Sequence, residues 1–339
     1  MTLPASSRFS FAPDLGICRV LNGMWQVSGA HGPIDAERAI VAMFAYHDAG
    51  FTSWDLADHY GPAEDLIGRF RRRFAEQCGA EHLGEIQAFT KWVPPPGPMS
   101  RQNVEQAIAV SLRRMGVDRL DLLQFHWWDY QDRRYLDALK HLADLRQEGR
   151  IRHLALTNFD TERLATICEH GIPIVSNQVQ YSLIDRRPDA RMAAFCQEHD
   201  ITLLTYGTLL GGLLSEKYLG HPEPGRGELT TASLQKYKNM IDAWGGWALF
   251  QELLAALKPI ADKHGVGIAT IGARYVLDRP AVAGVIIGAR LGIAEHIADN
   301  ARVFDVALDA DDLAMIEPVL APSRDLMRLI GDCGGEYRR

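Results

Sequence analysis

Four side chains of this 339-residue sequence have the chemistry of an acid–base site: Asp55, Tyr60, Lys91 and His126. A tyrosine, whose ordinary pKa is about 10, is a poor proton donor or acceptor at neutral pH. A neighbouring ammonium such as that of Lys91 would lower this pKa, and the carboxylate of Asp55 would keep the lysine charged and oriented. His126 could orient a carbonyl by hydrogen bonding or help to relay the proton. The four residues together predict an acid–base site, although each alone could be structural.

Each of these residues lies at or near the end of a short apolar run that predicts a β-strand. Eight such runs alternate with segments whose apolar residues recur three and four positions apart, as on one face of an α-helix. This alternation predicts a (β/α)8 TIM barrel, whose active site lies at the carboxyl ends of the strands. The expected strands are residues 18–21, 52–55, 85–90, 120–125, 152–156, 174–177, 201–205 and 284–287.

No linker divides the chain, so we predict one domain over residues 1–339. Its barrel core spans about residues 16–305, and the extension 306–339 holds a helix at 310–320 and a tail that could cover one barrel end. The segment 207–246 is long for a strand–helix connection and is expected to be a functional loop. The competing architecture is an open doubly wound sheet. That sheet would need a GxGxxG turn, but the turn after the first strand reads Asn22-Gly-Met-Trp-Gln-Val.

Charge and composition limit the class of partner. The sum of 36 basic and 43 acidic residues gives a net charge of −7, which argues against nucleic acid or an anionic membrane surface as the main partner. The start of the chain lacks the pattern of a signal peptide, and no apolar run is long enough to span a membrane. Five widely spaced cysteines without a CxxC pair read as reduced thiols. We expect a cytoplasmic protein with a small-molecule substrate; a homo-oligomer is compatible with the sequence.

The segment Phe51-Thr-Ser-Trp-Asp-Leu-Ala-Asp-His-Tyr-Gly61, followed by Glu64, resembles the signature of the aldo-keto reductase family: aspartate, x, alanine, x, x, tyrosine, glycine. Thr90-Lys91 and Leu122-Leu-Gln-Phe-His126 match its lysine and histidine motifs. The resemblance runs from about residue 23 to residue 300, and is strongest to the branch of the potassium-channel β subunits and bacterial aldo-keto reductases. It implies hydride transfer between a nicotinamide cofactor and an aldehyde, ketone or alcohol. The tetrad would be Asp55, Tyr60, Lys91 and His126, with Tyr60 as the general acid.

The same resemblance implies NADPH, preferred over NADH, bound without a glycine-rich Rossmann turn. Asn158 and Gln178 match residues that hold the carboxamide, and Tyr206 matches the ring that stacks on the nicotinamide. The segment from Thr208 to Tyr218 resembles a loop that covers the pyrophosphate, although its glycines could equally form a plain flexible loop. The expected cofactor-binding residues are Trp25, Asp55, Asn158, Gln178, Tyr206, Thr208, Leu209, Gly211, Lys217, Gly288, Arg290 and Asn300.

Three departures from the family pattern concern the cofactor and leave the tetrad intact. Thr208 replaces the usual proline after the stacking aromatic residue, and Gly288-Ala289 replaces the usual lysine-serine. Two extra residues precede Asp299-Asn300, so that His296 replaces a residue that is normally glutamine or arginine. Arg290 is then the one cation at this strand end that could bind the 2′-phosphate of NADPH, unless it is a solvated loop charge.

Four tryptophans follow strands one, three and four on the same face as the tetrad, and several of them are expected to form an apolar or sugar-stacking wall around the substrate: Trp25, Trp92, Trp127 and Trp128. Of these, Trp25, Trp92 and Trp127 are expected to line the pocket. Core packing is the alternative for each of them, as for the neighbouring Trp128. Trp54 directly precedes Asp55 on a strand, points to the opposite face and is expected to be packing.

Three other functions compete with the reductase. A metal-dependent barrel hydrolase would need a cluster of ligands such as HxH, and no such pair exists among the twelve histidines; we expect no metal. A glycosidase would need paired carboxylates at strand ends, which the fourth and seventh strands do not supply. A cofactor-binding regulatory or sensor subunit with slow turnover differs from the reductase only in rate, so turnover with a panel of aldehydes would distinguish them.

Overall fold

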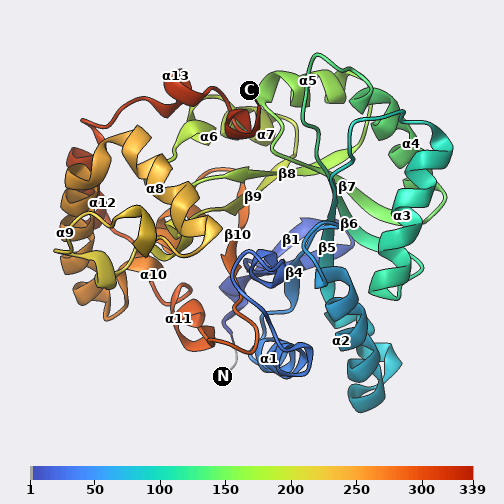
Figure 1. The fold of residues 1–339 in the computed structure, drawn as a ribbon, viewed down its shortest axis with the longest axis horizontal. Coiled ribbons are helices and arrows are strands. Elements are labelled where there is room, and N and C mark those ends of the chain that lie inside the picture. Colours follow the sequence, from blue (N-terminus) through green and yellow to red (C-terminus); the bar gives the residue numbers. More distant parts are fainter. Residues whose placement is uncertain (1–2, 339) are drawn as a thin grey trace.

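The computed structural model describes residues 3–338 and contains a closed barrel of eight parallel strands with helices around it (Figure 1). The order of the strands around the barrel follows the order of the chain, and the last strand pairs with the first. The strands are β3 (Val20–Gly23), β4 (Ser53–Asp55), β5 (Gln87–Trp92), β6 (Leu120–Phe125), β7 (Ile151–Thr157), β8 (Ile174–Gln180), β9 (Thr202–Tyr206) and β10 (Val282–Gly288). The predicted (β/α)8 barrel is therefore confirmed.

Thirteen α-helices lie within residues 3–338. Most of them follow a barrel strand and bury one apolar face against the sheet, which is why the sequence between strands has a helical period. They are α1 (Ala36–Asp48), α2 (Ala63–Cys78), α3 (Arg101–Met115), α4 (Tyr135–Gln147), α5 (Thr161–Glu169), α6 (Arg187–Ala190), α7 (Met192–Glu198), α8 (Ala232–Trp244), α9 (Gly246–His264), α10 (Ile268–Leu277), α11 (Ile297–Arg302), α12 (Ala310–Leu320) and α13 (Leu326–Ile330).

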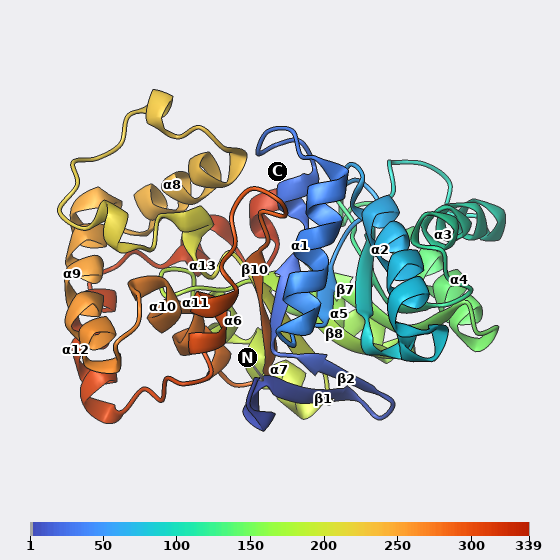
Figure 2. The ribbon, with the colours of Figure 1, turned by 90° about the horizontal axis from the view of Figure 1, so that it is seen from below.

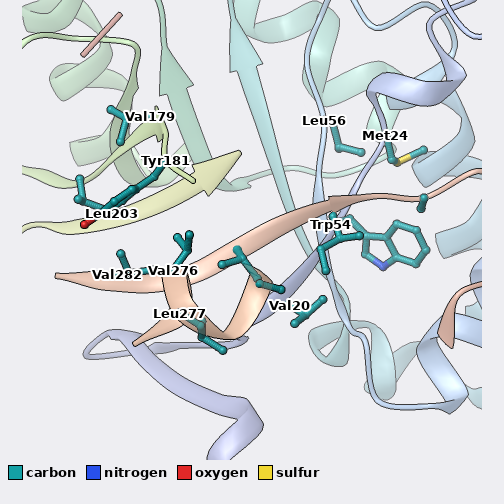
Figure 3. Close-up of a cluster of buried hydrophobic side chains, with 14 of the residues drawn as sticks. Val20, Met24, Trp54, Leu56, Val179, Tyr181, Leu203, Val276, Leu277 and Val282 are labelled. Atoms are coloured by element: carbon teal, nitrogen blue, oxygen red, sulfur yellow. The ribbon is translucent and has the colours of Figure 1, made fainter. Parts of the chain in front are cut away.

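Two apolar layers hold the barrel together. The outer layer lies between the sheet and the helices and includes Trp54, Val179 and Leu203, which Figure 3 shows together with neighbours from α10 and β10. The inner layer fills the barrel and includes Phe89 and Leu122. Because successive residues of a strand point to opposite faces, one strand supplies both layers and also the polar residues at the mouth.

An N-terminal hairpin closes one end of the barrel, a feature that the sequence reading missed. Strands β1 (Arg8–Ala12) and β2 (Leu15–Cys18) pair antiparallel, and Phe11 packs against Phe89 inside the barrel. The first barrel strand consequently begins at Val20, later than predicted. Figure 2 shows the hairpin at one end of the molecule and the C terminus at the other.

The two long segments outside the repeats are more structured than a loop. The segment 207–246 contains helix α8, whereas the sequence predicted a loop throughout, because glycines and prolines dominate the residues that precede this helix. The helix predicted at 310–320 is present as α12. The last described residues, 331–338, run across the mouth of the barrel, next to Asn158 and Tyr206.

Candidate active site

The barrel brings the four predicted acid–base residues to its mouth. Asp55 is the last residue of β4, Lys91 lies near the end of β5 and His126 directly follows β6; Tyr60 stands on the turn between β4 and α2. Asp55, Lys91 and His126 are each at most 3% exposed. Parallel strands end at the same edge, so residues 36 and 35 positions apart in the chain become neighbours.

A buried ion pair forms the base of the site. The ammonium of Lys91 donates to Asp55 Oδ2 at 2.6 Å and to the carbonyl of Leu56 at 2.8 Å. The same nitrogen lies 5.1 Å from the centroid of the Tyr60 ring. The lysine therefore contacts both the carboxylate that neutralises it and the phenol on which it would act.

Two amides hold the other oxygen of this carboxylate. Gln178 donates to Asp55 Oδ1 at 2.7 Å and Gln124 donates to it at 3.0 Å, while Gln178 also donates to Gln124 Oε1 at 2.7 Å. Gln124 was not among the predicted site residues. The signal was present, because Gln124 lies two positions before His126 on one strand and must point to the same face.

Burial sets the protonation of the lysine and the tyrosine. It lowers the pKa of Lys91 from its ordinary value, although the charge of Asp55 opposes this shift. It raises the pKa of Tyr60 well above its ordinary value, and the negative charge of Asp55 raises it further. The pKa of Tyr60 is therefore raised rather than lowered as expected, because burial and the negative charge of Asp55 dominate its surroundings. The phenol is protonated at neutral pH, which is the state that a proton donor requires.

His126 is held as a neutral imidazole. Its Nδ1 lies 3.1 Å from the carbonyl oxygen of Thr157, which can only accept, so Nδ1 carries the proton. Burial lowers the pKa of His126 to about 4. Nε2 is buried and, among the described residues, has no hydrogen-bond partner. This nitrogen offers a lone pair, so it can accept a hydrogen bond but cannot donate one to a carbonyl.

The aromatic wall differs from the predicted one. Trp25 packs edge-on against Tyr60, with ring centroids 5.0 Å apart, as expected for a pocket residue. Trp92 and Trp127 instead pack against Phe125 in the outer layer, with centroids 5.5 and 5.9 Å from its ring. Strand alternation explains this, because Trp92 follows the inward-pointing Lys91 and Trp127 follows His126.

Trp128 takes the place expected for Trp127. Its ring lies 4.3 Å from that of His126, edge to face, and its side chain is exposed. Tyr337 of the C-terminal segment lies on another side of the same histidine, with ring centroids 6.1 Å apart. The apolar surroundings of the acid–base residues therefore come from Trp25, Trp128 and Tyr337.

The expected nicotinamide residues lie beside the tetrad and contact one another. The hydroxyl of Tyr206, at the end of β9, donates to Asn158 Oδ1 at 2.7 Å. Asn158 has φ = 61°, a left-handed conformation that asparagine tolerates better than most residues. Within residues 3–338, no hydrogen bond uses Asn158 Nδ2 or Gln178 Oε1. One free donor and one free acceptor match the oxygen and the nitrogen of a carboxamide.

The expected pyrophosphate loop follows Tyr206 and is covered by α8. Thr208 is buried and donates to the carbonyl of Tyr181 at 3.3 Å, so it anchors the loop to the barrel. Gly211 has φ = 66°, and a Cβ there would come within 2.9 Å of the Ser233 backbone. Leu209 is partly exposed between them, and Lys217 is exposed on the short helix Glu216–Tyr218.

The expected adenosine residues lie after β10. A Cβ on Gly288 would come within 2.1 Å of the amide nitrogen of Gln26, whose Oε1 is buried without a partner among the described residues. Arg290 is exposed and, within residues 3–338, forms no ion pair; Asn300 is buried on α11. The Gln26 side chain fills the space beside Gly288, and its buried oxygen, unpaired among the described residues, is compatible with contact to a bound polar ligand.

The sequence profile of the Aldo/keto reductase family matches residues 19–321, which include every residue of the tetrad. The chain belongs to this family. It is a family of NAD(P)H-dependent reductases, in agreement with the resemblance noted in the sequence.

Two curated relatives illustrate the range within the family. This aldo/keto reductase is 30% identical over 260 residues to flagellar radial spoke protein 5 of Chlamydomonas reinhardtii, covering 66% of this chain and only 49% of that one. It is 22% identical over 336 residues to an NADH-specific methylglyoxal reductase of Escherichia coli, covering 92% and 97% of the two chains.

Solved structures confirm the fold. The structure of a glycerol dehydrogenase from Gluconobacter oxydans superposes with a TM-score of 0.76 at 23% identity, covering 97% of this chain and 98% of that one. In the described part of this aldo/keto reductase, no three His, Cys, Asp or Glu side chains are grouped as metal ligands. No helix between residues 3 and 338 is long and apolar enough to cross a membrane.

Proposed function

We propose that this protein uses NADPH to reduce an aldehyde or ketone to an alcohol, with Tyr60 as the general acid. The observation that carries the proposal is the placement of the Lys91 ammonium between the Asp55 carboxylate and the face of the Tyr60 ring. This arrangement stabilises negative charge on the phenol at the moment when the phenol gives up its proton.

Individual residues of the chain would have different roles in the reaction. A nicotinamide held by Asn158 and Gln178 would supply the hydride for the carbonyl carbon. Tyr60 then donates its proton to the alkoxide oxygen, and Lys91 stabilises the phenolate that remains. His126 Nε2 accepts a hydrogen bond from the phenol or from the new alcohol, which orients the oxygen at the site of proton transfer. In the reverse direction the same groups remove the proton from an alcohol.

The cofactor contacts are proposed from the free polar groups. Asn158 Nδ2 and Gln178 Oε1 would hold the carboxamide, and the ring of Tyr206 would support the nicotinamide. The loop 208–212 would follow the pyrophosphate, because glycine permits close approach of the backbone. Gln178 also contacts Asp55, so the residue that holds the cofactor belongs to the acid–base network.

The preference for NADPH over NADH rests on Arg290. Its guanidinium is exposed at the end of β10 and forms no ion pair with the described residues, so it is available for the 2′-phosphate. No acidic residue between 284 and 294 would repel that phosphate.

The test is NADPH oxidation with aromatic, aliphatic and sugar aldehydes, comparing the wild type with Tyr60→Phe. Loss of the general acid should reduce kcat by about 10²–10⁴-fold, and the affinity for NADPH should stay constant. Tyr135→Phe is the control, because this tyrosine packs outside the barrel against Trp127 and Phe159. Activity of Tyr60→Phe within threefold of wild type contradicts the assignment. Slow turnover of the wild type with every aldehyde would favour the sensor function instead.

A further inference from the structure

A carboxylate of the C-terminal segment is bound next to the proposed nicotinamide platform. Glu336 accepts a hydrogen bond from Arg187 Nη1 at 2.9 Å, and its other carboxylate oxygen lies 3.2 Å from the hydroxyl oxygen of Tyr206, whose single proton can be donated either to this oxygen or to Asn158 Oδ1. The Arg187 side chain is only 2% exposed and that of Glu336 only 9%. A charged side chain this deeply buried needs a partner of opposite charge.

Arg187 is already neutralised by another residue. It forms a two-pronged ion pair with Asp185, through Nε at 2.8 Å and Nη2 at 2.7 Å. Gln180 donates to the same carboxylate at 2.7 Å and fixes its orientation. The guanidinium is therefore rigid, and its remaining Nη1 donates to Glu336 and to the backbone carbonyls of Gly331 and Asp332 in the C-terminal segment.

Lys236 of α8 adds a second cation beside Glu336. Its ammonium lies 5.0, 5.3 and 4.6 Å from the ring centroids of Tyr206, Tyr237 and Tyr337, and donates to the Tyr337 hydroxyl at 2.5 Å. Although burial opposes it, the charges of Arg187 and Lys236 keep the pKa of Glu336 below its ordinary value.

Glu336 supplies negative charge to the cations at the mouth, which also include Arg338. Arg187 and Lys236 carry two positive charges, and Asp185 carries one negative charge. Without Glu336, at least one positive charge at the mouth has no partner among these groups. Leaving a buried charge unpaired is costly, so displacement of Glu336 requires another anion.

The geometry limits the size of that anion. The Tyr337 ring bridges Lys236, which its hydroxyl contacts, and His126, whose ring centroid is 6.1 Å away. Only the length of one tyrosine side chain therefore separates the Lys236 ammonium from the ring of His126. Glu336 and Tyr337 also lie on a short segment at the barrel mouth, whereas Arg187, Tyr206 and Lys236 belong to the barrel and its connections.

We propose that Arg187, Lys236 and the Tyr206 hydroxyl form an anion subsite, which Glu336 fills in the free protein and which the charged end of the substrate fills during reaction. The inference rests on the proposed reductase function and specifies its substrate class. The substrate is a short-chain aldehyde or ketone that carries a carboxylate or phosphate group a few carbon atoms from the carbonyl.

The kinetic test compares two four-carbon aldehydes, succinic semialdehyde with a carboxylate and butanal without one. Glu336→Gln removes the internal competitor and should lower KM for succinic semialdehyde about tenfold, the scale of one charge-assisted contact, with butanal unchanged. Lys236→Met should raise KM for succinic semialdehyde by a similar factor. Glu105→Gln and Lys258→Met are the controls, because both change exposed side chains on the outer helices α3 and α9. Equal effects on the two aldehydes overturn the proposal.

A binding test separates this inference from the reductase function. Butyrate, which cannot be reduced here, should raise the Tm of cofactor-free Glu336→Gln, while butanol should not, and Lys236→Met added to this variant should abolish the shift. The absence of a butyrate shift overturns the subsite even if aldehydes are reduced. A shift without any aldehyde turnover refutes the reductase function and keeps the subsite. If Glu336→Gln instead tightens NADPH binding tenfold and leaves the aldehyde ratio unchanged, the anion is the cofactor's pyrophosphate and the substrate assignment is wrong.

Discussion

The buried His126 makes a quantitative prediction about stability and pH. Burial lowers its pKa from 6.5 to about 4 in the folded protein. The unfolded chain therefore binds the proton more readily, so stability is complete above pH 6.5 and falls as the pH drops toward 4. For these two values, the loss between pH 8 and pH 5 is RT ln(30), or about 2 kcal/mol.

The perturbation that isolates this effect is His126→Gln, which removes the titrating ring and keeps a polar side chain. The free energy of unfolding is measured by urea denaturation of wild type and variant at pH 8 and pH 5. Because all other titrating groups are shared, the wild type should lose about 2 kcal/mol more than the variant over this interval. The NMR titration of the imidazole proton on Cε1 gives the pKa directly.

His170→Gln is the matched control for the hydrogen bond. His170 also places Nδ1 near a backbone carbonyl, that of Thr166 at 2.8 Å, but its side chain is exposed. Its replacement removes a similar contact without changing a buried group. Equal pH-dependent losses in wild type and His126→Gln, within about 0.5 kcal/mol, refute the view that this imidazole is held neutral by burial.

Three other substitutions test the rest of the site. Asp55→Asn leaves Lys91 buried without a counter-ion and should cost about 3–5 kcal/mol of unfolding free energy. Because Lys91 can lose its proton at high pH, this loss of unfolding free energy, measured by urea denaturation, should be smaller at pH 9.5 than at pH 7. Gln124→Leu removes one of the two amide donors to Asp55 and should cost about 1–3 kcal/mol by the same measurement, and no loss would remove Gln124 from the network. Arg290→Ala should weaken NADPH binding by about 1.5–3 kcal/mol in a fluorescence titration and leave NADH binding constant; equal losses exclude a role specific to the phosphate.

The sequence predicted the barrel because its determinants are local. Each strand is a short apolar run and each helix has an apolar face, so the alternation is visible without long-range information. Strand β6 and helix α12 have the predicted bounds, and the other barrel strands differ from prediction by a few residues. The hairpin β1–β2 was missed because its apolar side chains enter the barrel, a contact that is not local.

The differences between the expected and the observed surroundings of the site have a common cause. The alternation that correctly placed Trp54 outside the barrel also places Trp92 and Trp127 outside, since each follows an inward-pointing residue of the tetrad. The same rule would have identified Gln124 from His126. What no local rule predicts is the position of residues 331–338, because nothing in their sequence specifies that Glu336 meets Arg187 and Tyr206 at the mouth.

The position of Asp55 explains why the acid–base site lies inside a closed barrel. Its carboxylate is buried, and three donors offset the cost of removing it from water: Lys91, Gln124 and Gln178. They come from β5, β6 and β8, so no single strand–helix repeat could satisfy the charge. Gln178 would in turn hold the nicotinamide carboxamide, so the cofactor and the proton donor would be aligned through one carboxylate. A displacement of any of these strands should therefore impair hydride transfer and proton transfer together.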